Sequence, residues 1–114
     1  MEHVEIKPDD AQILTVLTAQ GDTDLNAPRH TLMYFYPTKK FFGRKASLEP
    51  VADALATQGW AVTTLSSKVL VAEAQQAADK VTVARRTAWA EDLAAQFDVD
   101  FDGWECAVYQ ADAA

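Results

Sequence analysis

Apolar side chains recur at the spacing of one helix face in three stretches of the chain. These stretches run from Pro8 to Gly21, from Ser47 to Gly59 and from Asp79 to Phe97. Pro8 suits a first helical position, while Ser47 and Asp79 can accept hydrogen bonds from the first backbone N–H groups of a helix. Gly21 and Gly59 suit the position just after a helix end. The pattern therefore predicts three helices.

Four other stretches have the composition of β-strands, at residues 30–36, 60–65, 68–74 and 104–109. The first is the strongest strand signal, because it is rich in aromatic residues. Its two faces are both apolar, with Leu32, Tyr34 and Tyr36 on one and Met33 and Phe35 on the other. A strand of this kind tends to be central in its sheet or covered on both sides.

Turn residues connect these strands. Ser66 and Ser67 predict a tight hairpin between the second and third strands, and Asp102 and Gly103 predict a turn into the last one. The order is a helix followed by β-α-β-β-α-β. It predicts an α+β fold, namely a ferredoxin-like sandwich with an additional N-terminal helix.

Composition narrows the class of protein. The chain has 114 residues, of which 49% are hydrophobic, and a formal net charge of −7. We expect a single domain over residues 1–114, with residues 1–7 and 110–114 flexible. The lone Cys106 cannot form an internal disulfide, and no signal-peptide or membrane-span pattern is visible, so we expect a cytoplasmic protein. The acidity argues against a protein that binds nucleic acid without regard to sequence.

Charge is distributed unevenly along the chain. Residues 29–45 contain five Lys or Arg and no acid, whereas residues 91–114 contain seven acids and no base. Arg85 and Arg86 fall on the flank of the third predicted helix, beside its apolar stripe. If folding keeps these segments apart, the molecule has two electrically different sides.

The side chains give little support for catalysis or metal binding. Residues 98–103 match the opening of an EF-hand calcium loop, but Tyr109 occupies the position of the closing Glu, so we predict no metal site. His30 has no evident partner for general-base chemistry, and Cys106 is predicted to face the core. We therefore predict no catalytic residue and no cofactor. RNA-recognition domains share the strand order, yet the third predicted strand lacks their aromatic residues, which argues against direct RNA binding.

One segment near the end of the chain follows the pattern aromatic-Asp-Val-acid-aromatic-Asp-Gly-Trp. It reads Phe97-Asp98-Val99-Asp100-Phe101-Asp102-Gly103-Trp104. It resembles the segment through which the family of the regulator of ribonuclease E activity B leaves its long helix and enters its last strand. Two shorter segments are also similar to the family, Gly59-Trp60-Ala61-Val62 and Gly21-Asp22. The resemblance covers about residues 10–110.

The resemblance implies a ferredoxin-like fold and a non-catalytic role. In that family the best-known member is a cytoplasmic protein that binds the C-terminal scaffold of ribonuclease E and lowers its RNA-degrading activity. It also implies structural roles for Asp102, Gly103 and Trp104. We accordingly expect a protein partner, not a nucleic acid or a membrane, and the oligomeric state stays open.

Exposed aromatic residues, the basic loop at residues 39–45 and nearby acids are the predicted contacts with that partner. The candidate residues are Tyr36, Lys39, Lys40, Phe41, Phe42, Arg44, Asp98 and Asp100. The basic loop is unlike the family's, and Asp112 is the one acid after the last predicted strand where known members have an acidic tail, so a different protein partner stays open. The alternative hypothesis is a small enzyme or ligand-binding domain with a pocket on the open sheet face or at a dimer seam, lined by His30, Tyr34 and Tyr36.

Overall fold

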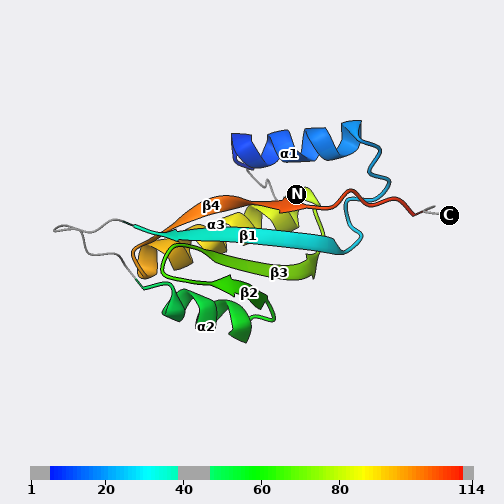
Figure 1. The fold of residues 1–114 in the computed structure, drawn as a ribbon. Helices are drawn as coiled ribbons and strands as arrows, with labels where there is room; N and C mark the ends of the chain where they lie inside the picture. Colours follow the sequence, from blue (N-terminus) through cyan, green and yellow to red (C-terminus); the bar gives the residue numbers. More distant parts are fainter. Residues whose placement is uncertain (1–5, 39–46, 112–114) are drawn as a thin grey trace.

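The computed structural model describes residues 6–38 and 47–111, and its elements follow the predicted order (Figure 1). They are α1 (Pro8–Ala19), β1 (Arg29–Pro37), α2 (Glu49–Thr57), β2 (Ala61–Leu65), β3 (Leu70–Gln76), α3 (Lys80–Gln96) and β4 (Val99–Cys106). The prediction of an α+β fold is confirmed. None of the helices within the described ranges is long and apolar enough to span a membrane.

The four strands form one antiparallel sheet in the order β2-β3-β1-β4, with α3 behind it in Figure 1. The predicted central position of β1 is confirmed. Alternation along β1 places Met33 and Phe35, both fully buried, on the face that α2 and α3 cover. Leu55 of α2 and Val83 of α3 are fully buried in the same core cluster. The opposite face of β1 is half-exposed to exposed, so β1 is central but covered on one side only.

The last strand begins earlier than predicted, because Asp102 and Gly103 lie inside β4 and not before it. Met33 pairs with Trp104 and Phe35 with Phe101, so β4 has one residue more than β1 in this interval. Such an extra residue is a β-bulge, which period-two alternation does not reveal. Gly103 has φ +90°, a backbone angle that favours glycine at this position. The turn into β4 lies instead at Asp98, which has φ 57°.

Two other element ends differ from the prediction. The hairpin between β2 and β3 is longer than two residues: the backbone N–H of Ser66 donates to the carbonyl of Val69 at 3.0 Å, and β3 begins at Leu70. The N-cap position of α2 is Leu48, not Ser47. Ser47 still contributes there, because its hydroxyl accepts from the backbone N–H of Glu49 at 3.3 Å. The predicted cap of α3 is confirmed, since Asp79 accepts from the N–H of Thr82.

A buried carboxylate attaches the additional helix to the rest of the domain. Asp10 of α1 is 5% exposed and accepts from the hydroxyl of Thr87 at 2.6 Å and from the indole Nε1 of Trp104 at 2.7 Å. These partners belong to α3 and β4. Asp10 is therefore the acceptor for two buried donors as well as a first-turn acid of α1.

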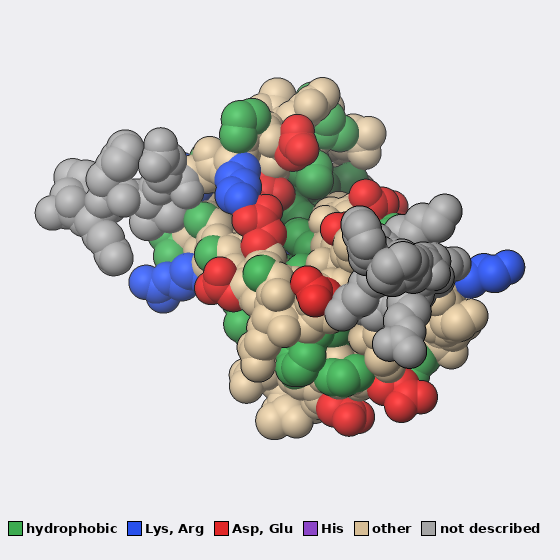
Figure 2. All heavy atoms as spheres, turned by 90° about the vertical axis from the view of Figure 1, so that its left-hand side faces the viewer, with side chains coloured by type: hydrophobic (Ala, Val, Ile, Leu, Met, Phe, Trp, Pro, Cys, Tyr) green, Lys and Arg blue, Asp and Glu red, His purple; other side chains and the backbone are tan. Residues whose placement is uncertain are grey.

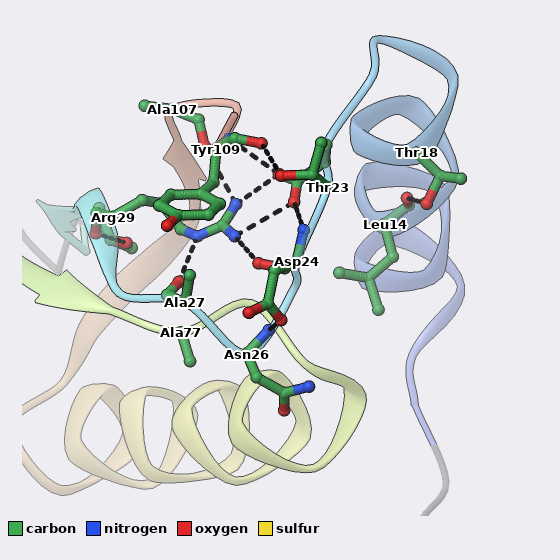
Figure 3. Close-up of polar contacts among 12 residues, drawn as sticks. Leu14, Thr18, Thr23, Asp24, Asn26, Ala27, Arg29, Ala77, Ala107 and Tyr109 are labelled. Carbon is green, nitrogen blue, oxygen red and sulfur yellow. Dashed lines mark hydrogen bonds and ion pairs between the residues drawn. The ribbon is translucent and has the colours of Figure 1, made fainter. Parts of the chain in front are cut away.

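Arg29 is buried as well, so it does not belong to a basic surface with residues 39–45. Its guanidinium donates to both carboxylate oxygens of Asp22, at 2.6 and 3.3 Å. Its other hydrogen bonds reach the carbonyls of Asp24, Ala27 and Ala107 (Figure 3). The hydrogen bond from Arg29 holds the pKa of Asp22 below its usual value of 3.8. This buried ion pair ties the loop after α1 to the segment after β4.

Replacing Asp10 with Ala should lower the free energy of unfolding by about 2 kcal/mol or more, because Trp104 and Thr87 keep buried donors without an acceptor. Asp9 is exposed and is the matched control. Its replacement with Ala should cost only about 0.5 kcal/mol through the helix dipole. Urea denaturation measures both, and equal effects of the two substitutions would contradict the assigned role of Asp10.

Replacing Asp22 with Asn should destabilise the protein by about 3–5 kcal/mol at pH 7, because Arg29 loses its buried counter-charge. The lowered pKa of Asp22 means that its contribution is present above about pH 4 and is lost as the pH falls through the folded-state pKa. The difference between wild type and variant should therefore shrink below about pH 4. Asp24→Asn is the control, and unfolding free energies of all three proteins between pH 3 and 7 test the prediction.

Candidate functional site

The face of the sheet turned away from α3 is the best candidate for a functional surface (Figure 1). We call it the open face and define it by alternation and strand register. Its central residues are Leu32, Tyr34 and Tyr36 of β1, Val71 and Glu73 of β3, and Asp100 and Glu105 of β4. All are half-buried or exposed, whereas their chain neighbours Met33, Phe35, Ala72 and Trp104 are buried.

The open face combines aromatic residues with negative charge. Leu32 pairs with Glu73 on one side and with Glu105 on the other, so that two carboxylates flank the central strand. Tyr36 pairs with Asp100. No Lys or Arg occupies the described positions that the register places on this face. A surface of this composition suits a cationic partner, because guanidinium groups both pair with carboxylates and stack on aromatic rings.

Two side-chain contacts join these carboxylates to β1. The hydroxyl of Tyr34 donates to Oε1 of Glu105, and this hydrogen bond raises the pKa of Tyr34 to about 12. Nε2 of His30 lies 3.5 Å from Oε1 of Glu73. Each glutamate thus has a contact with a side chain of β1. Both stay half-exposed or exposed and keep acceptor oxygens for a partner.

The structure brings together some of the predicted contact residues. Tyr36 at the end of β1 is 38% exposed, and its cross-strand partner Asp100 and the nearby turn residue Asp98 are exposed too. Figure 2 looks onto this end of the molecule and shows Asp and Glu side chains on several sides of it. The predicted contacts in the basic loop, namely Lys39, Lys40, Phe41, Phe42 and Arg44, lie outside the described residues.

The predicted structural trio lies beside this surface. Trp104 is 6% exposed and belongs to the core cluster. Gly103 forms part of the bulge, and Asp102 is exposed at the edge strand. Cys106, which was predicted to face the core, is half-buried and packs against the core cluster, and burial raises the pKa of its thiol.

Sequence reasoning missed Glu73 and Glu105, the two carboxylates nearest the centre of the open face. Alternation within the third and fourth strands could have placed them opposite their buried neighbours. The predicted strand order then sets β3 and β4 on the two sides of β1, which brings the two glutamates together. The alternative hypothesis places a pocket around His30, Tyr34 and Tyr36. The three hollows found on the described residues lie elsewhere, against the helices.

Replacing Glu105 with Gln should lower the pKa of Tyr34 from about 12 toward the ordinary value of about 10, because the phenolate no longer faces a carboxylate. Ultraviolet absorbance titration of the tyrosines measures the change. Glu91→Gln, on α3, is the control and should leave the titration unaltered. An unchanged tyrosine titration in Glu105→Gln would show that the cross-strand contact does not govern Tyr34.

Comparison with known proteins gives one result for nearly the whole chain. Residues 7–106 match the family described as regulator of ribonuclease activity B. A search of curated proteins found no match. The matched residues include α1, the whole sheet and both helices that cover it. The chain therefore belongs to the family of the regulator of ribonuclease activity B.

Proposed function

We propose that this protein is a non-catalytic regulator that acts on a ribonuclease through protein–protein contact. The observation that carries the proposal is its membership of a family of ribonuclease regulators. The partner we propose is the C-terminal scaffold of ribonuclease E, which places the protein in the cytoplasm. The finer assignment of residues 1–114 to a single ferredoxin-like domain is supported by the strand order β2-β3-β1-β4 and by one shared core.

We assign partner contact to the open face. Glu73 and Glu105 lie on either side of Leu32 in the strand register. Tyr36 and its partner Asp100 extend this surface toward the exposed Asp98, at the end of the sheet where β4 begins. Basic segments of a scaffold complement this charge, which speeds association and excludes acidic partners. Arginine fits best, because it can lie on a tyrosine ring while its donors reach a glutamate.

The same surface disfavours direct contact with RNA. Its carboxylates would face phosphates, and the described residues of β3 on this face, Val71, Glu73 and Gln75, include no aromatic ring on which a base could stack. RNA decay would therefore be affected through the bound ribonuclease.

The test is the affinity of purified ribonuclease E scaffold for the wild type and for the double variant Glu73→Lys/Glu105→Lys. The variant should bind at least about tenfold more weakly, because two favourable charge contacts become repulsive. Wild-type affinity should also fall between 50 and 300 mM salt, and calorimetry at both concentrations measures both effects.

Asp53→Lys/Asp92→Lys is the matched control, because these exposed acids on α2 and α3 give the same change in net charge away from the open face. It should bind nearly as well as wild type. An equal loss of affinity in both double variants would show that net charge, and not the open face, determines binding. If the wild type does not bind at low salt, the ribonuclease E scaffold is not its partner.

A further inference from the structure

Arg86 of α3 is the least satisfied charged group among the described residues. Although the sequence places it on the flank of the helix, its residue exposure is 6%. Its Nη1 donates to the carbonyl of Ala77 at 3.1 Å, and its Cζ lies 4.5 Å from the centroid of the Trp104 ring. Its Nε and Nη2 are buried and have no hydrogen-bond partner.

No carboxylate among the described residues lies within ion-pair distance of Arg86. Asp10 and Asp79 act on it electrostatically from farther away. Arg29, the other buried arginine among the described residues, differs from Arg86. It makes five hydrogen bonds, two of them to the carboxylate of Asp22. A buried cation with two N–H groups that lack an acceptor lowers the stability of the fold, unless a bound group supplies the acceptor.

The side chain of Arg86 also lines a hollow of about 370 Å³ between the α2–β2 connection and α3. The other lining residues are Gln58, Trp60, Gln76, Thr82, Arg85 and Trp89. This lining contains two arginines and no carboxylate, in a chain of net charge −7. A second hollow, beside α1, is lined by Asp9, Asp10, Glu91 and Asp102 together with Lys7. The first hollow is therefore a local exception to the acidity of the molecule.

We propose that this hollow binds the oxyanion of a small molecule, a carboxylate or a phosphate, with Arg86 as its principal ligand. Nε and Nη2 have no contact with solvent in this structure, so the oxyanion becomes their acceptor when the guanidinium turns toward the hollow. The hydroxyl of Thr82, which also lines the hollow, adds a hydrogen-bonding group. A guanidinium fork recognises both carboxylate and phosphate, because each presents two oxygens that its parallel N–H donors can reach together.

The walls indicate that the oxyanion belongs to a molecule with a planar ring. Trp60 and Trp89 both line the hollow, and the half-buried Trp89 offers the more accessible indole ring for stacking with an aromatic group. The volume is at the lower end of the range for small-molecule sites, which suits a compact ligand and not a protein segment. A nucleoside monophosphate and benzoate are therefore suitable probes for the two sources of the oxyanion.

The test follows tryptophan fluorescence and calorimetric heat while AMP, benzoate or adenosine is added to the full chain. AMP or benzoate should bind, and adenosine, which lacks the anion, should bind at least tenfold more weakly than AMP. The variant Arg86→Met should lose at least tenfold in affinity for the anionic probe. Its melting temperature should stay equal or rise, because replacing a buried charge by an apolar side chain of similar size is often neutral or stabilising.

Lys68→Met is the matched control, because it removes one exposed positive charge in the β2–β3 turn and should leave binding unchanged. Thr82→Val should weaken binding by a smaller factor and serves as a second variant if Arg86→Met does not fold. Binding of AMP alone would assign a phosphate ligand, and binding of benzoate alone a carboxylate. Equal affinity in wild type and Arg86→Met, or no binding of either anion at millimolar concentration, would overturn the proposal.

Discussion

The fold depends on how it buries one arginine. Arg29 begins the central strand on its covered face, where an uncompensated charge would cost several kcal/mol. Asp22 neutralises it, and three backbone carbonyls accept its remaining donors. Asp22 also accepts from the backbone N–H of Tyr109. The two members of this ion pair therefore join the start of β1 to the segment that follows β4.

A single extra residue in β4 decides which side chains form the open face. Val99 is buried on the covered side, so strict alternation would place residue 103 there and turn Trp104 outward. The bulge at Gly103 reverses this, because Trp104 is buried and Glu105 is exposed. The same bulge thus supplies the indole that hydrogen-bonds Asp10 and the carboxylate that Tyr34 binds. Core packing and surface charge follow from one backbone irregularity.

Periodicity was enough to predict the order of the elements and the central strand, since both depend on local apolar patterns. It could not reveal the bulge, because Asp102 and Gly103 have the same composition as a turn. Nor could it reveal the burial of Arg86, whose contacts with Ala77 and Trp104 come from other elements. A charged residue beside an apolar stripe is normally exposed, and only the tertiary structure overrides that expectation. The open-face glutamates were accessible in principle, but only by combining alternation with strand order.

The two proposed sites lie on opposite sides of the sheet, and distance limits how strongly they can act on each other. Arg86 lies with α3 on the covered side, whereas Glu73 and Glu105 belong to the open face. Layers packed on a sheet are about 10 Å apart, and the Debye length at physiological salt is about 8 Å. A bound anion would add negative charge to an already acidic molecule, and salt would weaken its effect on a partner across the sheet. A stronger coupling between ligand and partner would require a change in the packing of α3 against the sheet.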